Sequence, residues 1–144
     1  MEVKATGVTT LLQLKQINKV FNEATPDEKM ALANIDLQLK KGDFVTIIGS
    51  NGAGKSTLMN MISGKLIPDI GDVIIDGKVV TAFSEHKRAT DIGRVFQDPM
   101  AGTAPNMTIE ENLAIAYNRT KKRTLRLGLN KKRRDFFKEK LETL

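Results

Sequence analysis

The segment at residues 49–57, GSNGAGKST, constrains this chain more than any other feature. It matches the phosphate-binding pattern G-x-x-x-x-G-K-[ST] at every fixed position. The apolar stretch at 44–48 before it predicts a buried strand, and the apolar residues at 58–62 after it predict the start of a helix. Strand, loop and helix in this order form the setting in which the motif binds phosphate. The segment therefore predicts a nucleotide site and not a chance glycine-rich turn.

The residue types in this loop follow from the chemistry of a polyphosphate. Glycine has no Cβ, so the backbone can turn tightly and bring its N–H groups close to phosphate oxygens. The positive end of the following helix points at the same place. We expect Lys55 to reach the β- and γ-phosphates, Ser56 to ligate Mg²⁺ and Thr57 to lie near the α-phosphate. The whole predicted loop is Gly49, Ser50, Asn51, Gly52, Ala53, Gly54, Lys55, Ser56 and Thr57.

Composition narrows the class of protein. A length of 144 residues suits one compact domain, and 40% hydrophobic residues is ordinary for a folded chain. The absence of cysteine excludes disulfides and thiolate metal sites. No apolar run approaches the length of a membrane helix, and residues 1–6 lack the apolar core of a signal peptide. We therefore expect that the chain does not itself cross a membrane.

The net charge of +6 is concentrated near the C-terminal end, between residues 119 and 140, where basic residues far outnumber Asp135 and Glu139. Such a run can bind nucleic acid or a membrane surface, but it is more often a solvated face. No aromatic residue lies between 119 and 134 to stack on bases. We therefore favour a solvated face.

Alternating apolar and polar residues predict two strands, and other sequence signals predict a hairpin and a further strand. A strand at 12–17 is expected to continue to Phe21, and a second is expected at 32–39. Apolar residues on both sides of Asp76-Gly77 predict a tight hairpin at 73–80. A further buried strand is predicted at 92–96. The result is an α/β fold with a mixed sheet that begins with antiparallel strands.

Helix signals are local and clear. The helix from Lys55 is expected to end near Gly64, and a short helical turn is expected at 84–89, within a charged surface run. Thr108 and Glu111 form a capping box that opens a helix to about residue 117. Asn130 can cap a last helix.

Three features together resemble the nucleotide-binding subunit of ABC (ATP-binding cassette) transporters, from about residue 11 onward. The loop GSNGAGKST is close to that family's form of the motif. Residues 95–99, VFQDP, resemble its glutamine loop, and Phe21 lies where the family places an aromatic that stacks on adenine. The segment 70–77 also resembles the family's hairpin between these motifs.

The resemblance implies a P-loop NTPase-like fold and ATP with Mg²⁺ as cofactors. Lys55 and Gln97 would be catalytic, Ser56 and Gln97 would hold the metal, and Phe21 would stack on adenine. Residues 1–97 would form the front part of the ATP-binding core. Residues 98–144 would form the exit of the glutamine loop and the start of a helical subdomain.

The resemblance also implies the partners. These are transmembrane permease subunits, a second ATP-binding subunit that closes on two ATP molecules, and for an importer a solute-binding protein. The subunit would lie at the cytoplasmic face of the membrane, bound peripherally through its permease. Nucleic acid is not an expected partner.

Several family features are missing. The sequence has no L-S-G-G-Q signature segment, no buried strand ending in Asp-Glu and no later switch histidine. Asp76 belongs to the hairpin turn, His86 comes too early in the chain, and Glu110 and Glu111 suit the first turn of a helix. We therefore expect the front part of a cassette with an incomplete core, which binds ATP weakly and hydrolyses it slowly or not at all.

Two other function classes stay open. One is a soluble cassette protein that acts on nucleic acid or ribosomes, supported only by the basic run. The other is a non-hydrolysing nucleotide-binding module. A GTPase or kinase fits poorly, because the sequence has no N-K-x-D guanine motif.

Overall fold

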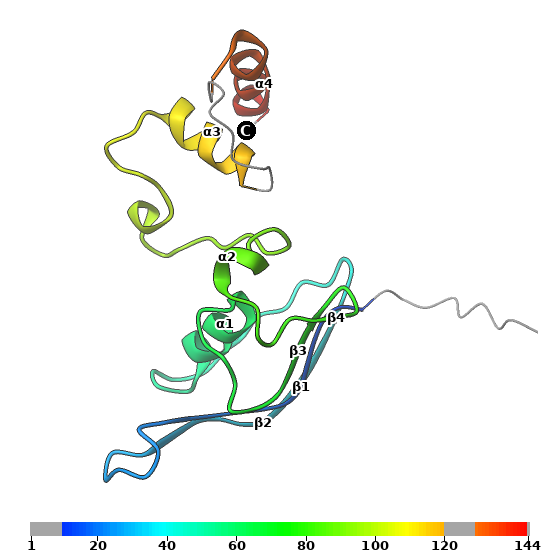
Figure 1. Cartoon of the computed structure of the whole chain (residues 1–144), viewed down its shortest axis with the longest axis vertical. Coiled ribbons are helices and arrows are strands. Elements are labelled where there is room, and N and C mark those ends of the chain that lie inside the picture. The colour runs from blue at the N-terminus through cyan, green and yellow to red at the C-terminus, as the bar shows by residue number, and fades with distance from the viewer. Residues whose placement is uncertain (1–9, 120–128, 144) are drawn as a thin grey trace, which may run out of the picture. The chain divides into compact units, whose positions relative to one another are not determined.

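The computed structural model describes residues 10–119 and 129–143. It divides into two compact units, Met1–Ile92 and Gly93–Leu144. The first unit holds the sheet and two helices, and the second holds the remaining helices (Figure 1). Each unit is described by itself.

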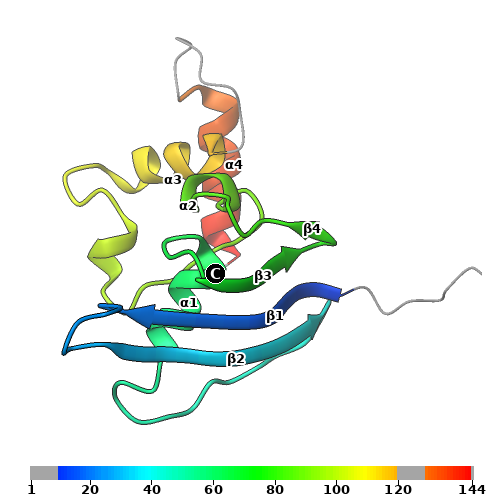
Figure 2. The same cartoon turned by 60° about the horizontal axis from the view of Figure 1, so that its bottom comes forward.

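The sheet of the first unit is antiparallel throughout. Strands β1 (Thr10–Phe21) and β2 (Lys29–Lys40) form a long hairpin. Strand β3 (Ile70–Ile75) pairs with the other edge of β1, and β4 (Lys78–Val79) pairs with β3. The strand order is β2-β1-β3-β4 (Figure 2). The strands predicted from alternating residues are confirmed.

A bulge in β1 keeps its apolar residues on one face. Leu14 and Ile17 are three residues apart, so strict alternation would point them to opposite faces. Both are buried, at 1% and 0% exposure. The register with β2 shifts between them, and Gln16 adopts a φ of 48°. The extra residue of the bulge therefore returns both side chains to the core.

The β3–β4 hairpin has the turn that its sequence predicts. Asp76 and Gly77 have φ values of 48° and 74°, as the two central positions of a type I′ turn require. This turn matches the right-handed twist of the two strands, so it closes the hairpin without splaying them.

Helix α1 (Lys55–Ser63) packs on the sheet and forms the core with it (Figure 1). Its Leu58 and Met61 are buried at 8% and 0% exposure. The other buried core side chains come from the strands and the segment after β4: Leu14, Ile17, Leu32, Val73, Ile75 and Val80. This packing fixes where the helix begins and so where the phosphate loop lies.

The short helix α2 (Glu85–Arg88) is confirmed, but the prediction that its charged residues all lie on the surface is wrong for Arg88. Arg88 is 1% exposed. Its guanidinium donates hydrogen bonds to the carbonyl oxygens of Met61 and Ile62 at the end of α1, and to those of Thr81 and Phe83. The sequence pattern of a charged run gives no sign of this role.

The strands predicted at 44–48 and 92–96 do not form, so these two predictions are wrong. Phe44 and Ile48 are 94% and 90% exposed, and Val95 is 97% exposed. A strand is stable only when a neighbour takes up its backbone hydrogen bonds. Within residues 10–119 and 129–143, no strand pairs with either segment. The α/β class with its antiparallel part is confirmed, but the expected parallel part of a mixed sheet is not formed among the described strands.

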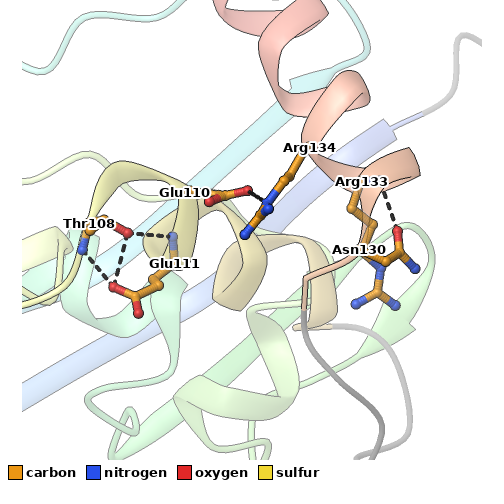
Figure 3. A network of polar contacts seen from close by, with 6 residues as sticks. All are labelled: Thr108, Glu110, Glu111, Asn130, Arg133 and Arg134. Carbon is orange, nitrogen blue, oxygen red and sulfur yellow. Dashed lines mark hydrogen bonds and ion pairs between the residues drawn. The ribbon is translucent and has the colours of Figure 1, made fainter.

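The second unit consists of the 3₁₀ turn η1 (Pro99–Gly102) and two helices, α3 (Ile109–Asn118) and α4 (Lys131–Glu142). Both predicted N-terminal caps are confirmed (Figure 3). The hydroxyl of Thr108 accepts from the backbone N–H of Glu111 at 3.3 Å, and the Glu111 carboxylate accepts from the backbone N–H of Thr108 at 2.8 Å. The side chain of Asn130 accepts from the backbone N–H of Arg133.

Aromatic rings join α3 to α4. The ring of Tyr117 lies 5.7 Å from that of Phe136 and 5.8 Å from that of Phe137. An ion pair between Glu110 and Arg134, 2.6 Å long, links the same helices (Figure 3). Residues 120–128 of the basic run lie outside the described residues. In the part of the chain that the structure describes, no helix is both long enough and apolar enough to span a bilayer.

Candidate functional site: the phosphate loop

A cavity of about 270 Å³ lies between the phosphate loop and the end of the β1–β2 hairpin. Residues 51–57 form one side of it. Phe21, Lys29 and Ala31 form the other. All of these residues belong to the unit Met1–Ile92, so the structure brings most of the predicted loop and the predicted adenine-stacking residue to one cavity.

The N-terminus of α1 opens at this cavity. The helix begins at Lys55, and its N-cap residue Gly54 has no side chain that could take up an N–H group. The N–H groups of Lys55, Ser56 and Thr57 have no acceptor within the helix, because the first intrahelical bond is Leu58 N–H to Gly54 O, at 2.8 Å. These free donors and the positive end of the helix dipole favour an anion here.

Gly54 fixes the loop against strand β2. Its φ of 85° lies in the left-handed region. A Cβ at this position would lie 2.5 Å from the carbonyl oxygen of Ala31 and 3.1 Å from the side chain of Leu32. Only glycine avoids both the backbone strain and the contact with β2. The second fixed glycine of the motif therefore also sets how close the helix comes to the hairpin.

The side chain of Lys55 reaches back from the first residue of α1 into the preceding loop. Its ammonium donates hydrogen bonds to the carbonyl oxygens of Gly49 and Ser50, at 2.7 and 2.8 Å. The loop is closed further by the backbone bond from Ala53 N–H to Ser50 O. An ammonium has three donors and no acceptor, so Lys55 supplies a positive charge to the same loop whose helix end favours an anion.

Phe21 is the last residue of β1 and is half-buried. Its ring lines the cavity, and the ammonium of Lys19 lies 5.8 Å from the ring centroid. Lys19 is held there by an ion pair with Asp69. A flat apolar ring on one side of a cavity and anion-binding donors on the other match the two ends of a nucleotide. The stacking role of Phe21 stays a prediction.

Lys29 is a residue of this cavity that the sequence did not point out. It is the first residue of β2 and pairs directly with Phe21 across the hairpin. Its Nζ lies 3.6 Å from the point where a Cβ on Gly52 would stand. The alternating pattern predicted a strand only from residue 32. If the second strand had been predicted to be as long as the first, Lys29 would have been placed opposite Phe21.

Gln97 lies in the other unit, Gly93–Leu144, in an exposed bend directly before η1. The side chain of its neighbour Asp98 caps that turn by accepting from the backbone N–H of Met100 at 2.9 Å. The hydroxyl of Ser56, at the loop, and the amide oxygen of Gln97 are hard oxygen donors of the kind that Mg²⁺ prefers. Their chemistry fits the ion, and their roles as ligands stay predictions.

A family model described as ABC transporter matches residues 32–144. The tyrosine transport ATP-binding protein of Clostridioides difficile is 41% identical over 122 residues, which are 85% of this chain and 49% of that protein. The spermidine/putrescine import ATP-binding protein PotA of Lawsonia intracellularis is 36% identical over 76% of this chain and 27% of its own length. The chain thus spans about half the length, or less, of these curated relatives.

Solved structures agree with the family match. A dimeric ATP-binding cassette in a post-hydrolysis state, with ADP and phosphate bound, has a TM-score of 0.71 at 30% identity, over 92% of this chain and 56% of that one. A nucleotide-free cassette from an ABC transporter has a TM-score of 0.62 at 33% identity, over 90% of this chain and 46% of that one. This chain belongs to the ABC transporter family of ATP-binding proteins.

Proposed function

We propose that this chain binds Mg-ATP at the loop 49–57 as part of an ABC transporter subunit that couples ATP binding and hydrolysis to solute transport. The observation that carries the proposal is the shared cavity. The open helix end, the Lys55 ammonium and the ring of Phe21 all belong to it or to the loop that lines it. The names of the relatives, which include transport and import ATP-binding proteins, support the same function.

Each residue has a distinct task in this proposal. The backbone N–H groups of the loop and of the first turn of α1 hold the polyphosphate. The ammonium of Lys55 gives up its hydrogen bonds to the loop carbonyl oxygens and binds the β- and γ-phosphate oxygens instead. Ser56 and Gln97 provide oxygen ligands for Mg²⁺, and Phe21 stacks on adenine.

We further propose that the intact subunit works at the cytoplasmic face of a membrane, bound to permease subunits. A second ATP-binding subunit would face it, and a solute-binding protein would deliver the solute if the transporter is an importer. A solved relative is dimeric, which supports the second of these partners. The membrane subunits would choose the solute.

Hydrolysis by this 144-residue chain alone is expected to be slow or absent. Phosphoryl transfer depends on positioning and on charge stabilisation, and the attacking water needs an oriented acceptor. The sequence supplies the positioning loop but no strand ending in Asp-Glu. Phosphate release at the rate of an intact cassette, measured with malachite green, would contradict this expectation.

The central test is ATP binding by the chain and by the Lys55→Ala variant, measured by isothermal titration calorimetry with Mg²⁺ present. Loss of hydrogen bonds to a charged group costs about 1.5–3 kcal/mol, so affinity should fall at least roughly 10-fold. Lys65→Ala removes an exposed lysine just beyond the same helix and should leave affinity unchanged. Equal affinity of the Lys55→Ala variant and the parent chain would refute the site.

A further inference from the structure

We propose that Lys29 is a second cation of the nucleotide site, and that its ammonium binds the phosphate chain of ATP from the side of the β-hairpin. This inference rests on the proposed function, because it concerns the same bound nucleotide. The 49–57 motif does not include Lys29, which lies on a different element.

The backbone places Lys29 beside the loop. It lines the cavity together with residues 51–57, and its Nζ lies 3.6 Å from the Cβ position of Gly52. Lys29 and Phe21 are direct partners across an antiparallel pair, so their side chains stand on the same face of the hairpin. A nucleotide whose base stacks on Phe21 and whose phosphates meet the loop therefore passes this ammonium.

The charge of Lys29 is available for a ligand. Among the described residues, no carboxylate forms an ion pair with it. The neighbouring carboxylate of Glu28 accepts a hydrogen bond from the backbone N–H of Ala24. Lys19, by contrast, lies near the same ring but is paired with Asp69. Lys29 thus differs from Lys19 in having its ammonium directed to a cavity that already favours anions.

The interaction is that of a flexible point charge with a polyanion. Its strength should therefore grow with the number of phosphates and decline with salt. A lysine that only supported Phe21 or the strand would affect AMP and ATP equally. These two dependences separate a phosphate contact from a structural role.

The experiment uses the full 144-residue chain and fluorescent N-methylanthraniloyl derivatives of ATP and AMP. We expect Lys29→Gln to raise the Kd for the ATP derivative about 3- to 10-fold, as for one partly exposed charge-assisted contact. The change for the AMP derivative should be clearly smaller, and the salt dependence of ATP binding should become flatter. Lys29→Arg should restore the affinity to within about twofold, because it keeps the charge.

Lys15→Gln is the matched control, because Lys15 is an exposed lysine of β1 that does not line the cavity. It should change neither Kd. Thermal unfolding should be the same for all variants, since both lysines are exposed. If the parent chain binds ATP, Lys55→Ala loses it and Lys29→Gln does not change it, this inference is wrong and the proposed function stands. An equal loss for the ATP and AMP derivatives would also overturn it. If the parent chain binds neither derivative, both proposals fail.

Discussion

Arg88 satisfies four backbone carbonyl oxygens with one guanidinium group, two of them at the C-terminal end of α1. Helix ends leave carbonyl groups without intrahelical partners, and burial makes such groups costly unless something donates to them. Burial also lowers the pKa of Arg88 from its ordinary value, although an arginine keeps its charge in proteins. Gly64 makes room for this side chain, because a Cβ there would lie 2.9 Å from the Arg88 Nε.

Replacing Arg88 with Met should lower the free energy of unfolding by about 3 kcal/mol, because buried carbonyl groups lose their donors. Arg88→Lys should recover only a small part, since an ammonium lacks the planar fork that reaches several acceptors at once. Urea unfolding followed by circular dichroism measures both values. Lys65→Met serves as a surface control. A loss below about 0.5 kcal/mol for Arg88→Met would show that water can replace the guanidinium.

The phosphate loop could be predicted from the sequence because its chemistry is local. Each fixed residue of the motif acts within the same nine-residue segment, by allowing its tight turns or by supplying a group that binds phosphate. Arg88 and Lys29 could not be predicted in this way, because their partners are distant in sequence. Met61 lies 27 residues before Arg88, and Gly52 lies well beyond Lys29. Only the folded chain shows which backbone a long side chain reaches.

The ends of the elements are fixed by side chains that take up backbone groups. Asp69, in the connection between α1 and β3, accepts from the backbone N–H of Val20 at 2.7 Å and pairs with Lys19. The capping box of Thr108 and Glu111 does the same for α3. Hydrogen bonds from Thr108 hold the pKa of the Glu111 carboxyl below its ordinary value.

The link made by Asp69 should depend on pH. Two hydrogen bonds lower the pKa of Asp69 below its usual 3.8. The one from Lys19 has the larger effect, and the one from the backbone N–H of Val20 has the smaller effect. A carboxyl of this kind stabilises the fold above its unfolded pKa, and the contribution disappears as the pH falls through the folded pKa. The side chain is 38% exposed, so we expect less than about 1 kcal/mol.

We therefore expect Asp69→Asn to lower the melting temperature by a constant amount from pH 7 to about pH 5. The difference from the parent chain should shrink below about pH 4. Thermal melts across this range measure it. Asp91→Asn is the control, because the side chain of Asp91 is exposed and bonds to no other residue in the part of the chain that the structure describes. A difference that grows on acidification would have the wrong sign for this mechanism.

The cap of α3 gives a separate prediction. Thr108→Ala removes the hydroxyl that accepts from Glu111 N–H and should destabilise the helix by about 1 kcal/mol. Thr108→Ser keeps the hydroxyl and should behave like the parent chain. Amide hydrogen exchange in the first turn of α3 reports the effect directly. Unchanged exchange in the alanine variant would mean that solvent caps this helix equally well.

Element type was predictable wherever it depended on short-range pattern. Alternation predicted β1 and β2, a cap residue predicted α3 and α4, and Asp76-Gly77 predicted the β3–β4 hairpin. The apolar runs at 44–48 and 92–96 have the composition of buried strands, but a strand also needs a hydrogen-bonding neighbour. That requirement concerns the whole sheet and cannot be read from the run itself.

At the scale of the whole molecule, apolar side chains remain exposed in both units. Phe44 and Ile48 in the first unit and Val95 in the second are each at least 90% exposed. Large apolar side chains that stay exposed can mediate association with another protein surface. The family match and the relatives' length agree with a chain that represents part of a larger cassette fold.

Replacing Phe44 with Ser and Ile48 with Thr together should reduce the association of this chain with itself. The two side chains are almost fully exposed, so their loss should leave the melting temperature unchanged. Light scattering and the binding of an apolar dye both measure the expected decrease. Ile17→Thr is the contrasting variant. Ile17 is fully buried, so this substitution should lower the melting temperature. Unchanged light scattering of the double variant would show that other residues mediate the association.

The ammonium of Lys55 is already bonded to two carbonyl oxygens of its own loop. An anion that takes up more than one of the three ammonium donors must therefore replace at least one of these neutral acceptors. A chloride ion offers one charge and little directionality, whereas a di- or triphosphate offers several charged oxygens to the same donor. The bonds that Lys55 already makes within its loop should therefore raise the preference of this loop for polyphosphates over monovalent anions.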